Sequence, residues 1–118
     1  MIDHISVPCT DLARSRAFYA AALAPLGYAV LMEFPGAIGL GEPHKPDLWL
    51  SAGPVQPFHI AIHAPNRAAV DAFHAAALAA GGQDNGGPGL RPQYHPNYYG
   101  AFVLDPDGHN LEAVCHGP

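Results

Sequence analysis

The 118-residue sequence contains few charged residues, and few of these are basic. Lysine and arginine number 5 together, against 10 aspartates and glutamates, so the formal net charge is −5 at pH 7. A surface with this charge repels the phosphate backbone of nucleic acids and the headgroups of anionic membranes. The sequence therefore predicts a protein that binds neither nucleic acids nor membranes.

The sequence also lacks segments that would direct it out of the cytoplasm. Its first residues, Met1–His4, have neither the basic start nor the apolar run of a signal peptide. The longest uncharged stretch, residues 17–32, is too short to span a bilayer and contains a proline and a glycine. Cys9 and Cys115 are the only cysteines, too few for a disulfide framework. We expect a cytoplasmic protein with reduced thiols.

What the sequence does contain is an internal repeat. When the chain is shifted by 55 residues against itself, His4–Val7 aligns with His59–Ile62, and 11 of the 24 positions from His4 to Gly27 are identical. Alanine raises this number, but the matched His, Ile, Phe and Leu residues do not depend on alanine. The repeat predicts a single domain, residues 1–118, made of two modules of about residues 1–54 and 55–118.

Each module is predicted to contain a strand, a helix and three further strands. In the first strand of each module, apolar residues alternate with other residues. A capping residue then precedes an alanine-rich helix, which ends near a glycine. The later strands are expected at 28–34, 37–41, 47–51, 98–104 and 110–115, and the glycines at 86–89 obscure one more. This order predicts an α+β fold. Two tandem βαβββ modules are expected to form a curved mixed sheet around a metal- and substrate-binding cleft, with the helices outside.

Alternation along the strands places His4, His59 and Glu112 on the sheet face that is turned away from the helices. Two imidazoles and a carboxylate bind a divalent metal and leave coordination positions open for a substrate. We therefore predict one metal ion at these residues, and the ligand set does not choose among Fe, Mn, Zn, Ni and Co. A lone strand histidine is more often a hydrogen-bonded core residue, but matching repeat positions favour ligation. His44 and His109 are predicted to lie in solvated turns.

These motifs resemble the vicinal oxygen chelate superfamily, which groups glyoxalase I, fosfomycin-resistance thiol transferases, extradiol dioxygenases and bleomycin-resistance proteins. The resemblance covers nearly the whole chain. It is carried by His4–Val7 with Asp11 opening the helix, by the copy His59–Ile62, by the alanine-rich second helix, and by the closing hairpin Asp105–Glu112. The superfamily usually has asparagine where this hairpin has His109.

The resemblance implies that metal ligands come from the first and last strands of each module. His4, His59 and Glu112 fill three of these places, and Trp49 occupies the fourth. Tryptophan cannot bind a metal, so the four-ligand pattern of glyoxalase I is broken. The extradiol dioxygenases and fosfomycin transferases use a His, His, Glu set like this one.

The segment Leu90–Gly100 is rich in aromatic and polar residues and is predicted to be a binding loop. It offers an arginine that can bind an anion, phenol donors and an imidazole. Together with Trp49 and His63, these groups are expected to line a pocket for a small oxygenated anion. The predicted substrate-binding residues are Trp49, His63, Arg91, Tyr94 and Tyr99, and the predicted proton-transfer residues are His95 and Tyr98. The alternative is that the tyrosines are ordinary strand and interface residues.

Two functions from different classes follow. The first is a metal-dependent enzyme that chelates vicinal oxygens of a small substrate, as a lyase or isomerase of the glyoxalase type or as a ring-cleaving dioxygenase. The second is a metal-free small-molecule binding or sequestering protein of the bleomycin-resistance type, which the retained ligand set disfavours. A thiol transferase is disfavoured because the sequence has no cluster of Lys and Arg.

We expect a homodimer, because sheet edges need to be covered. The sequence leaves open whether each site is shared between chains.

Overall fold

The computed structural model describes all 118 residues and contains both predicted modules. The first module consists of β1 (Ile5–Cys9), α1 (Leu12–Leu23), the 3-10 helix η1 (Ala24–Leu26), β2 (Ala29–Phe34), β3 (Ala37–Gly41) and β4 (Leu48–Ala52). The second consists of β5 (His59–His63), α2 (Arg67–Ala79), β6 (Gln83–Leu90), β7 (Tyr99–Leu104) and β8 (Asn110–Cys115). The α+β class and the βαβββ order are confirmed. The strand that the glycines obscured is β6.

Each module forms its own four-stranded mixed sheet, with the orders β1-β4-β3-β2 and β5-β8-β7-β6. The first and last strands of each module pair in parallel, and the other neighbours are antiparallel. Ser6 pairs with Trp49 in one sheet and Ala61 pairs with Glu112 in the other. Trp49 and Glu112 therefore occupy equivalent positions, as the repeat indicates. The strands β1 and β5 each form an edge of their sheet.

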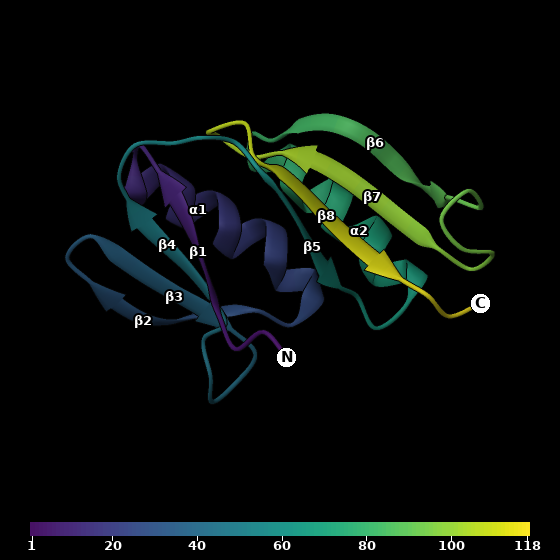
Figure 1. Ribbon diagram of the computed structural model, residues 1–118, viewed down its shortest axis with the longest axis horizontal. Helices are drawn as coiled ribbons and strands as arrows, with labels where there is room; N and C mark the ends of the chain where they lie inside the picture. The colour runs from purple at the N-terminus through teal and green to yellow at the C-terminus, as the bar shows by residue number, and fades with distance from the viewer.

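The helices cover one face of the two sheets and join the modules (Figure 1). α1 packs on β3 and β4, α2 packs on β6, β7 and β8, and the two helices contact each other. A single cluster of 21 buried apolar residues includes members of both modules. The modules thus share one core, and the opposite face of each sheet stays free of helices. Neither helix is long and apolar enough to cross a membrane.

Local sequence signals explain where the helices begin and end. The Asp11 side chain accepts a hydrogen bond from the Arg14 N–H at the start of α1, and Asn66 accepts one from the Ala69 N–H at the start of α2. η1 continues from α1 and ends at Gly27, which has a φ of 90° that favours glycine. The capping residues therefore fix where each helix begins.

The prediction that His109 lies in a solvated turn is wrong. His109 is fully buried, its Nδ1 accepts a hydrogen bond from the Phe58 N–H at 3.2 Å, and its Nε2 donates to the Pro8 carbonyl oxygen at 2.8 Å. The β7–β8 turn packs against the end of β1, so this side chain is enclosed between the modules. His44, in the β3–β4 turn, is exposed as predicted.

Two aspartates of the same β7–β8 turn reach the first module. The Tyr19 hydroxyl donates to Asp105 Oδ2 at 2.6 Å, and the Thr10 hydroxyl donates to Asp107 Oδ1 at 2.6 Å. Asp105 is buried, so its carboxylate depends on the Tyr19 hydroxyl and on the backbone N–H groups of Asp107 and His109. The turn that follows β7 therefore fixes the second module against the start of α1.

Candidate functional site

His59 and Glu112 lie side by side on the helix-free face of the second sheet. They come from the paired strands β5 and β8, and His59 Nε2 is 2.8 Å from Glu112 Oε1. The Glu112 side chain is 1% exposed, whereas the His59 side chain is 51% exposed. A buried carboxylate requires charged or hydrogen-bonding partners, and His59 supplies one from the solvent side. The structure thus brings two of the predicted ligands together.

Tyr98 completes the surroundings of this carboxylate. Its hydroxyl donates a hydrogen bond to Glu112 Oε2. Burial, followed by the hydrogen bond and the charge of Glu112, raises the pKa of Tyr98 to about 12, so the phenol keeps its proton at neutral pH. The ring of Tyr94 packs edge-on against the ring of Tyr98 with centroids 5.1 Å apart.

These side chains line a pocket of about 410 Å³, whose lining residues are His59, Tyr94, Tyr98, Phe102 and Glu112. Sequence reasoning did not select Phe102, although this residue pairs with Glu112 across the β7–β8 ladder and therefore shares its face. Phe102 stands four residues after Tyr98, so strand alternation predicts the same face for both residues, and this pattern could have identified Phe102 from the sequence. The pocket combines an apolar wall with one carboxylate, one imidazole and two phenols.

His4, the third predicted ligand, does not join this cluster within the chain. It precedes β1, its Nδ1 lies 2.8 Å from Asp3 Oδ1, and its side chain is 57% exposed. No group of three or more His, Cys, Asp or Glu side chains in the single chain is placed to hold a metal ion. The separation of the two modules' sheets accounts for this. His4 precedes β1, an edge strand of the first sheet, whereas His59 begins β5, an edge strand of the second sheet.

The donor atoms that are present suit a divalent metal. Imidazole nitrogen and carboxylate oxygen are ligands of Fe, Mn, Zn, Ni and Co in proteins. Glu112 is buried without any lysine or arginine as an ion-pair partner, and Tyr98 fixes one of its oxygens as outer hydrogen-bond partners fix metal ligands. His59 and Glu112 therefore fit as two ligands of a site that needs at least one more.

The other predicted site residues lie in several places. Trp49 is on the first sheet, where its indole stacks on Phe34 with centroids 6.1 Å apart. Tyr99 points away from the pocket, because its hydroxyl donates to Asp71 of α2 at 2.6 Å. His95 lies outside the pocket lining, and its ring meets that of His116 edge-on.

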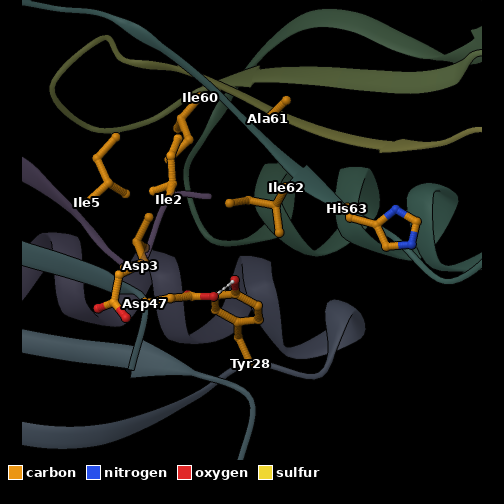
Figure 2. Close-up of a pocket in the computed structure, with 10 residues that line it drawn as sticks. Ile2, Asp3, Ile5, Tyr28, Asp47, Ile60, Ala61, Ile62 and His63 are labelled. Atoms are coloured by element: carbon orange, nitrogen blue, oxygen red, sulfur yellow. Dashed lines mark hydrogen bonds between the residues drawn. The ribbon is translucent and has the colours of Figure 1, made fainter. Parts of the chain in front are cut away.

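His63 lines a second cavity, a groove of about 270 Å³ between β1 and β5 (Figure 2). The lining is mostly apolar and includes Ile2, Ile5, Leu48, Ile60, Ala61 and Ile62, with Asp3, Tyr28, Asp47 and His63 as the polar members. Figure 2 shows His63 at one end of the groove and Ile5 at the other. The Tyr28 hydroxyl donates to Asp47 Oδ2 at 2.9 Å, drawn as a dashed line. Sequence reasoning did not predict this groove, because it depends on how the two sheets are placed.

Solved structures with the same fold come from several bacteria. A glyoxalase/bleomycin resistance protein from Albidiferax ferrireducens T118 is 28% identical, with a TM-score of 0.80, and 98% of each chain is covered. An enzyme of the glyoxalase/bleomycin resistance protein/dioxygenase family from Burkholderia phytofirmans PsJN is 18% identical, with 98% of each chain covered and a TM-score of 0.76. Lactoylglutathione lyase from Agrobacterium tumefaciens is 19% identical, with a TM-score of 0.71, covering 97% of this chain and 92% of that one.

No curated protein matches the sequence significantly. A family model does match, over residues 1–113, and it describes the Glyoxalase/Bleomycin resistance protein/Dioxygenase superfamily. The match includes both modules, the His59–Glu112 pair and the β7–β8 turn. The chain therefore belongs to the glyoxalase/bleomycin resistance protein/dioxygenase superfamily, the vicinal oxygen chelate superfamily that its repeated motifs resemble.

Proposed function

We propose that this protein is a small metal-dependent enzyme whose divalent ion chelates two neighbouring oxygens of a small substrate. The observation that carries the proposal is the buried Glu112 carboxylate, held by His59 on one oxygen and by Tyr98 on the other. The reaction is that of a lyase or isomerase of the glyoxalase type or of a ring-cleaving dioxygenase. When bound, the metal supplies Lewis acidity for an oxyanion on the substrate.

The residues of the pocket have separate roles in this proposal. His59 and Glu112 hold the metal, and Tyr98 orients the Glu112 carboxylate through its hydroxyl proton. Tyr98 also lines the cavity, so its hydroxyl proton is within the pocket where a substrate oxygen would bind. Phe102 and the ring of Tyr94 provide apolar walls against which a small substrate can pack.

The third ligand, His4, is proposed to come from a second copy of the chain in a homodimer. Two features support a shared site. β1 and β5 are edge strands that can pair with another chain, and the groove between them exposes apolar side chains such as Ile60. His4 stands directly before β1 and its side chain is more than half exposed, so it is accessible to a neighbouring protomer at that edge.

A complementation experiment tests both the metal and the shared site. We expect wild-type protein to bind about one Mn²⁺ or Zn²⁺ per chain, and His59→Ala or His4→Ala to bind it at least about 100-fold more weakly. Unfolding His4→Ala and His59→Ala together and refolding them as a mixture should restore tight binding at about a quarter of the sites. In a two-fold dimer, half of the dimers are mixed and each has one intact site.

The matched control is a mixture of His59→Ala with Glu112→Gln, which restores nothing in a shared site because both ligands belong to the same module. No restoration in the first mixture, with each single variant folded, would contradict the shared site. Failure of the wild type to bind any of the five metals would contradict the enzyme proposal.

The second candidate is a metal-free binding protein, which is favoured by the separation of His4 from the other two ligands in the single chain. Stoichiometric ligand binding by demetallated protein, unchanged in Glu112→Gln, would support it. Within the enzyme proposal, lactoylglutathione turnover that persists without dioxygen supports a lyase. Dioxygen consumption with a catechol supports a dioxygenase.

A further inference from the structure

Arg91 differs from most other cations of the chain, because it makes no ion pair. Arg14, Arg16 and Lys45 each contact a carboxylate, as expected for a protein with a net charge of −5. The Arg91 guanidinium lies instead over the ring of Phe102, with its carbon 5.4 Å from the ring centroid. Phe102 lines the pocket, and its ring centroid lies 6.1 Å from that of His59, so Arg91 stands beside one wall of the pocket.

Main-chain contacts hold the guanidinium in one place. Its NH1 donates to the Gly89 carbonyl oxygen and its NH2 to the Gly87 carbonyl oxygen, both at 2.9 Å. The absence of a side chain at Gly86 and Gly89 makes room for this approach, because a Cβ there would lie 3.2 and 3.3 Å from the two terminal nitrogens. The glycines that obscured β6 in the sequence thus form a cradle for this arginine.

The loop that carries Arg91 is also fixed. The Arg91 N–H donates to the Tyr98 carbonyl oxygen at 2.7 Å, and the Arg91 carbonyl oxygen accepts from the Tyr94 N–H at 3.0 Å. A guanidinium has five N–H donors, of which two are used on carbonyl oxygens. The remaining N–H donors are held in one place on a planar cation. Such a group binds the oxygens of a carboxylate or a phosphate well.

We propose that Arg91, beside the Phe102 wall of the pocket, binds an oxyanion of the substrate and that the substrate is therefore anionic. The substrate would carry a carboxylate, phosphate or phosphonate group on the same small molecule whose oxygens reach His59 and Glu112. This assignment of a substrate class rests on the proposed function, but anion binding at Arg91 requires no metal.

The test uses the full-length, metal-free protein and two probes, inorganic phosphate and acetate, titrated at constant ionic strength. Binding is followed by NMR through the amide signals of Gly86, Gly87 and Gly89 and the Arg91 Nε signal. We expect saturable shifts with at least one probe, weakened about 10-fold or more in Arg91→Gln. A stronger response to phosphate indicates a phosphate or phosphonate substrate, and a stronger response to acetate indicates a carboxylate.

The matched control is Arg67→Gln, because Arg67 also makes no ion pair and also lies over an aromatic ring, that of Tyr99, at 5.1 Å. It should bind the probe as the wild type does. If Arg91→Gln does not fold, Arg91→Lys keeps the charge without the fork and should bind at an intermediate strength. No saturable shift in the wild type, or an equal response of Arg91→Gln and wild type, overturns the proposal.

The two proposals fail separately. Metal binding measured by calorimetry should be unchanged in Arg91→Gln, because Arg91 contacts neither His59 nor Glu112. A wild type that binds the anion but no metal contradicts the proposed function alone. A wild type that binds metal but neither anion contradicts the Arg91 assignment alone.

Discussion

The two sheets share one pairing pattern but present opposite chemistry on their helix-free faces. Trp49 and Glu112 occupy equivalent registers, yet Trp49 stacks on Phe34 and Glu112 binds His59. One module thus offers an aromatic surface and the other a buried carboxylate paired with an imidazole. The comparison teaches that the repeat determines where a side chain is presented, whereas the individual substitution determines what that position can do.

The corresponding turns of the two modules differ as well. The β7–β8 turn buries His109 and Asp105 against the first module, whereas His44 in the β3–β4 turn is exposed. The second module's turn therefore buries polar side chains at the junction between the modules, which the exposed His44 of the first module's turn does not do. A chain of two similar units gains a defined arrangement because one of its two closing turns has become polar, buried and fully hydrogen-bonded.

The largest expected effect comes from breaking this junction. His109→Ala should lower the free energy of unfolding by about 3 kcal/mol, because it leaves the Pro8 carbonyl and the Phe58 N–H unsatisfied and opens a cavity. Urea denaturation measures the change. The control His44→Asn should change stability by less than about 0.5 kcal/mol. Equal effects of the two variants would show that the turns do not differ.

A smaller effect is expected from the aromatic face of the first sheet. A Cβ at Gly39 would lie 2.9 Å from Trp49, so Gly39→Ala should displace the indole and cost about 1–2 kcal/mol. Trp49 is the only tryptophan, so its fluorescence reports the displacement directly. The control is Gly53→Ala, where an added Cβ meets no atom within 4 Å. An unchanged emission spectrum in Gly39→Ala would contradict the packing of this face.

The smallest effect concerns the exposed pair that joins α1 to β2. Arg16 holds the pKa of Glu33 below its ordinary value of 4.5, so the pair's contribution is present above that value and is lost as the pH falls through the lowered pKa. Glu33→Gln should therefore reduce the urea midpoint only slightly at pH 7, and the difference should shrink at low pH. High salt should also remove it. A difference that grows as the pH falls would contradict this assignment.

Much of the fold follows from patterns of short range. Strand 110–115, the 55-residue repeat and the equivalence of Trp49 with Glu112 are all correct from alternation and self-similarity. These predictions are correct because the alternation of side chains along a strand and the capping of a helix depend on neighbouring residues alone. The same parity brought His59 and Glu112 to one face, and parallel pairing of β5 with β8 made them neighbours.

The placement of side chains between distant segments was not available from such patterns. The sequence by itself determined the two βαβββ modules and the shared face on which His59 and Glu112 lie. Only the tertiary structure decided that His109 is buried, that His4 stands apart from the other two, and that Arg91 rests on β6 carbonyl oxygens. The physical reason is that periodicity assigns a residue to a face, whereas proximity depends on how two separate sheets and a folded loop pack together.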